Sequence, residues 1–300
     1  MFRSLKIAAV IVGFSCVSAA LACSISGQGG FVPENDLYIP AGLKGMRGGI
    51  TESQFNSVID KVETLYAPIV SSMGGKLEIE RKWDDGTVNA YAKQTGTSWQ
   101  VAMFGGLARH ATITADGMSL VVCHELGHHI GGAPKKSGSI FGGGEVNAWA
   151  SNEGQADYFA TLKCLRKTFL NDDNISIVSA MQVPKALTDA CVKSTKNDKE
   201  DNALCVRTGM AGKSVANLFA ALSKLPEAKF DTPDTKKVSR TNDAHPKAQC
   251  RLDTYFQGSL CEISMNEDVS QKEEVKGTCH PSLGHKIGTR PLCWFKPKAK

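Results

Sequence analysis

Apolar side chains recur at helical spacing in the stretch of chain that follows residue 50. Thr51 and Gln54 open this stretch as a capping box, in which each side chain accepts a hydrogen bond from the backbone of the other. The apolar positions repeat at intervals of three and four residues, and they are Phe55, Val58, Ile59, Val62, Leu65, Tyr66 and Ile69. This periodicity predicts an amphipathic helix over residues 51–70 that buries one face.

The pattern then changes to short strand-like runs separated by Gly and Asp-Gly turns, and afterwards returns to helical periodicity. The predicted strands are 76–83, 88–93 and 98–106. The predicted helices beyond them are 115–132, 151–169, 209–225 and 245–257. Because strands come first and helices follow, rather than alternating with them, the chain is expected to have an α+β fold.

The first 22 residues differ from the rest of the chain. Arg3 and Lys6 precede an apolar run that ends in Ala-Leu-Ala at 20–22, which fits the small-residue rule for signal cleavage. The run is short for a membrane span, which needs about 20 apolar residues. We expect a cleaved signal peptide, with an uncleaved anchor as one alternative and lipid attachment at Cys23 as another.

The cysteines also suggest export. Apart from Cys16 and Cys23, eight of the ten cysteines remain, and no C-x-x-C spacing occurs, so disulfides are expected rather than a zinc ribbon. Neighbours along the chain suggest three pairs, which are Cys191 with Cys205, Cys250 with Cys261, and Cys279 with Cys293. The periplasm is the expected compartment, and a lipoprotein anchored at Cys23 or a secreted protein are the alternatives.

Charge and hydropathy exclude two classes of partner. The formal net charge is only +5, and no stripe of Lys and Arg interleaved with aromatic residues occurs, so we expect no nucleic-acid partner. We expect no transmembrane segment once the signal is removed. The oligomeric state is not indicated by the sequence.

A metal-binding motif lies in the stretch "VVCHELGHHIGG" at 121–132. His124 and His128 are four residues apart, so one face of a helix presents both imidazoles. This spacing suits two ligands of a tetrahedral zinc ion, and Glu125 is suited to act as a general base on zinc-bound water. The apolar neighbours of the motif predict a buried helix, where ionisable groups need partners or a metal.

The motif lacks its third ligand. Gly131 fits the extended H-E-x-x-H-x-x-G-x-x-H pattern, but Pro134 stands where that pattern has a histidine. Glu145 and Glu153 are the other candidates. We favour Glu153, because Asp157 lies one helical turn beyond it and an acidic residue there can orient a ligand histidine.

Two further residues of the motif need an assignment. His129 is five residues from His124 and points away from the same metal, so we expect it to bond to backbone or water. The zinc helix and the helix of Glu153 must pack together, which makes a disulfide between Cys123 and Cys164 geometrically possible. The alternative is a pair of buried thiols.

Four short segments of the chain together carry a resemblance to a known protein family. They are "NAYA" at 89–92, "HELGHH" at 124–129, "EGQAD" at 153–157 and "HPKAQCR" at 245–251. In this order they resemble the gluzincin metallopeptidases that include the CAAX prenyl proteases and the periplasmic outer-membrane quality-control proteases. The resemblance implies a zincin-like fold with a small mixed sheet whose edge strand lines the cleft.

The resemblance also implies roles for residues of this chain. Glu153 would be the third zinc ligand and Asp157 would support the site. The strand at 98–106 would be the edge that pairs with extended substrate. His245 and Arg251 would approach the active site, where both could stabilise the oxyanion, or the histidine could instead occupy the open zinc position.

These features predict an exported zinc endopeptidase that acts on extended protein or peptide substrates, with zinc as its only cofactor. The expected parts are a signal peptide at 1–22, a metallopeptidase domain at 23–260 and a disulfide-held C-terminal extension at 261–300. The alternative is a non-catalytic binding or chaperone-like module that keeps the gluzincin fold. The intact Glu125 argues against it, since a structural zinc needs no general base.

Overall fold

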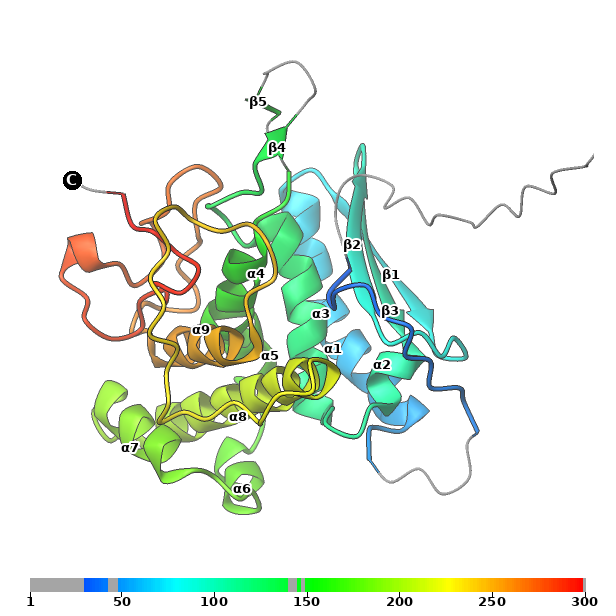
Figure 1. Ribbon diagram of the computed structural model, residues 1–300, viewed down its shortest axis with the longest axis horizontal. Helices are drawn as coiled ribbons and strands as arrows, with labels where there is room; N and C mark the ends of the chain where they lie inside the picture. Colours follow the sequence, from blue (N-terminus) through cyan, green and yellow to red (C-terminus); the bar gives the residue numbers. More distant parts are fainter. Residues whose placement is uncertain (1–29, 43–47, 140–144, 147–148, 299–300) are drawn as a thin grey trace, which may run out of the picture.

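The computed structural model describes residues 30–42, 48–139, 145–146 and 149–298. These residues form an α+β arrangement with a small mixed sheet, as the sequence predicted (Figure 1). The expected signal peptide at 1–22 and the candidate lipidation site Cys23 lie outside the described residues. No helix within the described part of the chain is long and apolar enough to cross a membrane.

The first long helix, α1 (Glu52–Ser72), begins and packs as its periodicity predicts. Thr51 accepts a hydrogen bond from the backbone of Gln54, and the Gln54 side chain accepts one from the backbone of Thr51. The buried face consists of Phe55, Ile59, Val62, Tyr66 and Val70. This face packs against β1 and α3.

Three strands form the mixed sheet, in the order β1-β3-β2. They are β1 (Lys76–Lys82), β2 (Ala90–Thr95) and β3 (Ser98–Phe104). β3 is parallel to β1 and antiparallel to β2. The expectation that 98–106 would be the exposed edge is therefore wrong, because β3 is hydrogen-bonded on both sides. The tight turn after β2 folds β3 back on it, so the strand left at the edge beside α3 is β2.

Two capped helices carry the metal-site motifs. α3 (Ala115–Ile130) begins where Thr114 accepts a hydrogen bond from Gly117, and almost all of its residues are buried. α4 (Glu153–Phe159) begins at Asn152, which caps Gln155, and continues through a π-helical turn, η1 (Ala160–Cys164), into α5 (Leu165–Phe169). Figure 1 shows α3 in the middle of the molecule, with the sheet on one side and α4 on the other.

The other elements surround this centre. They are α2 (Gly105–Arg109), β4 (Gly138–Ser139), β5 (Glu145–Val146), α6 (Asn174–Ser179), α7 (Lys185–Ser194), α8 (Lys199–Leu222), α9 (Ala248–Leu260) and the 3-10 turn η2 (Pro281–Leu283). α8 packs on both α3 and α9. It begins ten residues before the predicted 209, because its first turns are polar and Asp198 caps them.

Four disulfides join the eight cysteines that the described residues contain. The Cys123–Cys164 bond links α3 to η1, which confirms the sequence hypothesis, and Cys191–Cys205 is also as expected. These bonds indicate an oxidising, exported compartment.

The other two expected disulfide pairs are wrong. The bonds are Cys250–Cys293 and Cys261–Cys279. Cys250 lies in the first turn of α9 and Cys261 follows its last residue. Eleven residues of helix span about 16 Å, whereas the Cα atoms of a disulfide lie within about 7 Å of each other.

The C-terminal chain packs directly on the helix of Glu153. The ring of Trp294 lies over Gly154, where an added Cβ would come within 2.2 Å of it. The indole Nε1 donates a hydrogen bond of 2.9 Å to Thr254 on α9. Glycine at 154 is thus needed for this close approach, and the C-terminal chain helps to fix α4 against α9. The expected division of the chain at residue 260 stays a prediction.

Candidate metal centre

His124, His128 and Glu153 converge in the interior of the protein. One ligand atom from each lies within 4.8 Å of the others, and all three side chains are almost completely buried. Both histidines come from α3, as the helical spacing predicted, and Glu153 is the first residue of α4. Glu145, the other carboxylate considered, lies in β5.

Each histidine is held by its Nδ1 atom. His124 Nδ1 lies 2.7 Å from Asp157 Oδ1, and His128 Nδ1 lies 2.8 Å from the backbone carbonyl of Ser151. An Nδ1–H that donates to these oxygens leaves the Nε2 lone pair of each ring free. The expected role of Asp157 as an orienting residue fits this geometry.

The donor atoms at the centre fit a metal ion. His124 Nε2 and Glu153 Oε2 lie 3.3 Å apart, yet neither has a hydrogen-bond partner of acceptable geometry among the described residues. An unpaired buried polar atom costs about 1–3 kcal/mol. A cation bound between two imidazole nitrogens and a carboxylate would remove this cost at both atoms, and this donor set is common for zinc. The arrangement itself does not identify the metal.

The charges around His124 also favour binding of a cation. Burial alone would lower the pKa of His124, but the carboxylates of Asp157 and Glu153 raise it to about 9. Burial likewise opposes ionisation of Glu153, yet the nearby histidines and Lys136 hold its pKa well below the ordinary value. A metal at this site therefore displaces a proton from His124 and meets an ionised carboxylate.

Glu125 follows the first ligand on α3 and is only 1% exposed. Its Oε1 atom has no hydrogen-bond partner among the described residues. Burial raises the pKa of Glu125 to about 7. A buried carboxyl with a free oxygen beside a metal site has the chemistry expected of a general base.

A hydrogen-bonded group lies behind His124. Asp157 Oδ1 accepts from Arg251 Nη2 at 2.6 Å and from the Tyr255 hydroxyl at 2.7 Å, in addition to His124. Arg251 Nη1 donates to the carbonyl of Phe31 at 3.3 Å, and Nε donates to Tyr255. Burial alone would lower the pKa of Arg251, but Asp157 raises it above its ordinary value.

Arg251 approaches the centre, as expected, but from behind Asp157. Its side chain is completely buried, and its hydrogen bonds go to Asp157, Tyr255 and Phe31. These donors are occupied by fixed acceptors rather than directed to a reacting group. The contacts of Arg251 reach His124, a candidate metal ligand, through Asp157.

His245 does reach the centre, as expected. Its Nε2 atom lies 3.3 Å from Glu153 Oε2 and 2.9 Å from the carbonyl of Gly30. The side chain is 20% exposed, and burial lowers its pKa. The imidazole thus stands at the boundary between the ligands and the solvent.

Lys136 contacts the carboxylate of Glu153, which no pattern in the sequence indicated. Its Nζ atom lies 2.8 Å from Glu153 Oε1, on a side chain that is 16% exposed. The residue sits in the glycine-rich stretch after α3, where no periodic pattern marks it. Tyr255, also missed, could have been found, since it lies one helical turn after Arg251 on the same face.

His129 lies outside the ligand group, in agreement with its spacing. Its ring is stacked between Trp99 and Trp149, with centroid distances of 5.4 Å and 4.6 Å. Its Nε2 atom lies 3.1 Å from the carbonyl of Gln100 on β3. Burial lowers the pKa of His129 to about 4, so this imidazole is neutral and fastens α3 to the sheet.

The edge of β2 passes close to the centre. The backbone N–H of Phe31 donates a hydrogen bond of 2.7 Å to the carbonyl of Ala90, and the Phe31 ring lies 4.8 Å from the ring of His124. Within the described residues, no backbone group from outside the sheet bonds to β2 beyond Ala90. Among the described residues, this part of the edge therefore keeps backbone groups without partners outside the sheet.

Comparisons of the chain with protein-family models, with curated proteins and with solved structures found no match. The resemblance to gluzincins therefore rests on the motifs and on the arrangement of the residues described above.

Proposed function

We propose that this protein is an exported zinc endopeptidase of the gluzincin type. The observation that carries the proposal is the convergence of His124, His128 and Glu153 beside the buried carboxyl of Glu125. When bound, zinc would polarise the scissile carbonyl and activate a water molecule for attack. The four disulfides support export, and the periplasm is the compartment we favour.

Side chains of the protein would carry out the proton transfer, the stabilisation of the oxyanion and the positioning of the ligand. Glu125 takes a proton from the attacking water and passes it to the leaving amine. His245 Nε2, which contacts the carbonyl of Gly30 and lies 3.3 Å from Glu153 Oε2, would turn from Gly30 to donate a hydrogen bond to the developing oxyanion. Asp157 and Arg251 hold His124 in the orientation that keeps Nε2 available.

The substrate would bind as an additional strand. The open edge of β2 beyond Ala90 offers backbone donors and acceptors to an extended chain, and this fits protein or peptide substrates without a fixed sequence. We therefore propose that β2, rather than β3, takes the role that the resemblance assigns to the edge strand.

The decisive experiment compares the zinc-loaded protein with its Glu125→Gln variant on an unfolded protein substrate. We expect chelator-sensitive cleavage by the native protein, and a loss of about 100- to 10,000-fold in the variant with zinc content unchanged. Glu200→Gln, a change at the exposed start of α8, serves as the matched control. Equal rates for Glu125→Gln and the native protein would contradict the proposal. Zinc binding without any cleavage would favour the non-catalytic module.

A further inference from the structure

A basic cleft adjoins the proposed metal centre. It has a volume of about 640 Å³ and is lined by Ser137 and by the continuous segment 236–244. Three of the lining residues are cationic, and they are Lys236, Lys237 and Arg240. All three are exposed, and none of them forms an ion pair with a described residue.

The single acidic residue that lines the cleft is already bound. One oxygen of Asp243 accepts hydrogen bonds from the backbone and hydroxyl of Ser137, and the other accepts a bond of 3.1 Å from Asn152. Its charge is thus directed to the cap of α4 and not to the cations. With three cations and one carboxylate, the lining of the cleft still carries an excess of positive charge.

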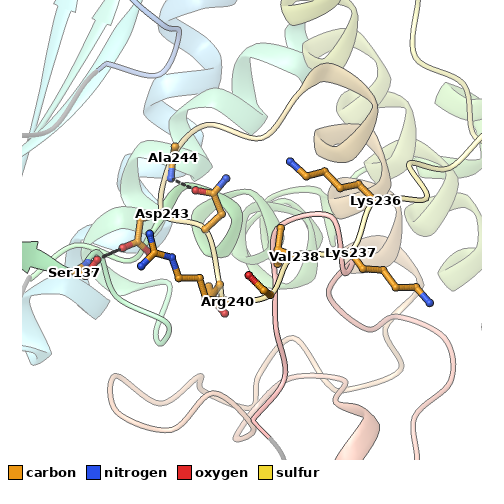
Figure 2. Close-up of a pocket in the computed structure, with 10 residues that line it drawn as sticks. Ser137, Lys236, Lys237, Val238, Arg240, Asp243 and Ala244 are labelled. Carbon is orange, nitrogen blue, oxygen red and sulfur yellow. Dashed lines mark hydrogen bonds between the residues drawn. The ribbon is translucent and has the colours of Figure 1, made fainter.

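Two segments of the chain link the lining of the cleft to residues of the centre. Ser137 follows Lys136, whose Nζ atom contacts Glu153, and Ala244 precedes His245, which contacts the same carboxylate. Figure 2 shows the Arg240 side chain on the side of Asp243 and Ser137, with Lys236 extending toward Ala244 and Lys237 pointing away from both. Lys236 and Arg240 are the two cations that face the hollow.

The wall of the cleft is fixed by the C-terminal chain. Val238 and Asn242 donate backbone hydrogen bonds of 2.9 Å and 2.8 Å to the carbonyls of Leu292 and Trp294. The Cys250–Cys293 disulfide fastens this C-terminal chain to α9. The cations are thus carried by a segment that is held in place at both ends, which suits a preformed binding site.

We infer that this cleft binds acidic side chains of the peptide substrate on one side of the scissile bond. The inference rests on the proposed peptidase function and adds a substrate class to it, namely extended peptides that carry Asp or Glu near the cleavage point. A peptide that leaves the edge of β2 near His245 meets Lys236 and Arg240 in the adjoining cleft, where carboxylates are stabilised by charge complementarity.

The test uses pairs of fluorogenic peptides of equal length with amidated C-termini. Each pair differs only in Glu or Gln at one of the three positions on either side of the scissile bond. We expect Glu to lower KM at one or two positions by roughly tenfold, with little change in kcat, and the advantage to shrink at high salt. Lys236→Ala/Arg240→Ala should abolish this advantage, and Lys236→Glu/Arg240→Glu should reverse it.

Lys193→Ala/Lys199→Ala is the matched control, because both lysines are exposed and lie in α7 and α8 outside the cleft. It should keep the native preference for Glu. Equal KM values for all Glu and Gln pairs with the native protein would overturn the inference while leaving the peptidase function intact. Persistence of the advantage in Lys236→Ala/Arg240→Ala would overturn it as well.

A binding measurement separates failure of the inference from failure of the proposed function. Fluorescence anisotropy of the labelled peptides on the Glu125→Gln variant needs no turnover. Tighter binding of Glu than of Gln peptides, lost when Lys236 and Arg240 are also replaced by Ala, would support the cleft even if no peptide is cleaved. Equal binding of both peptides would refute it, whatever the cleavage assay shows.

Discussion

The two sides of the metal centre differ in their exposure to solvent. On one side His124, Asp157, Arg251 and Tyr255 are completely buried and bonded to one another, and we call them the floor. On the other side the side chains of Lys136 and His245 are 16% and 20% exposed, and we call them the rim. Both sides contact the candidate metal ligands, but only the rim is also open to solvent.

Charged residues that surround the same candidate metal site are therefore expected to have different roles, depending on their exposure to solvent. In the floor, Arg251 and Tyr255 both donate to the buried carboxyl of Asp157, so removal of either leaves this group with fewer partners. At the rim the side chains of Lys136 and His245 are themselves partly exposed, so water can replace them and a change there is expected to cost less stability. Floor residues are therefore expected to control folding and metal affinity, whereas rim residues are expected to control turnover.

The largest effect on stability is expected for Arg251→Met. Loss of the guanidinium leaves the buried carboxyl of Asp157 with only His124 and Tyr255 as partners, which should lower the free energy of unfolding by about 3–5 kcal/mol. Urea unfolding of the zinc-loaded protein measures this, with Lys193→Met on the exposed face of α7 as control. A loss below about 1 kcal/mol would show that the buried contacts of the floor contribute little to the stability of the protein.

A smaller loss of stability is expected when the Cys123–Cys164 disulfide is replaced by two alanines. Removal of a disulfide typically costs about 2–4 kcal/mol, and here it also frees α3 from η1, which follows the helix of Glu153. We expect weaker zinc binding as well, measured by competition with a chromogenic chelator.

The Cys191–Cys205 bond provides the matched control for this prediction, because it joins α7 to α8 away from the metal ligands. Its replacement by alanines should reduce stability but leave zinc affinity unchanged. If both double variants weaken zinc binding equally, the link between α3 and η1 has no special importance for the metal centre.

The smallest effect on stability, below about 1 kcal/mol, is expected for His245→Ala at the rim. Turnover should nevertheless fall by roughly 100-fold, since a donor to the oxyanion is lost. Steady-state kinetics and zinc analysis measure the two effects, and His245→Gln, which keeps a donor, should recover part of the rate. Unchanged kinetics would remove His245 from the mechanism, and loss of zinc would make it a metal ligand.

Features set by neighbours along the chain could be predicted from the sequence. The periodicity of α1, its capping box and the common face of His124 and His128 follow from helical geometry alone. The separation of Glu153 and Asp157 by one helical turn likewise indicated two residues that act on one site.

Features that depend on the path of the chain in space could not be predicted in this way. Three strands in a row do not reveal that β3 pairs on both sides, although its buried run Val101–Phe104 is typical of a central strand. The wrong pairing of Cys250 with Cys261 could have been avoided, because a helix between two cysteines keeps them apart.

The sequence by itself determined that His124 and His128 share one face of a helix as candidate metal ligands, because a spacing of four residues needs only local helical geometry. Only the tertiary structure decided which groups surround them. It placed Arg251 in the floor, Lys136 and His245 at the rim, and the edge of β2 beside the metal ligands. The physical reason is that burial and partners depend on packing between distant segments, which local periodicity does not encode.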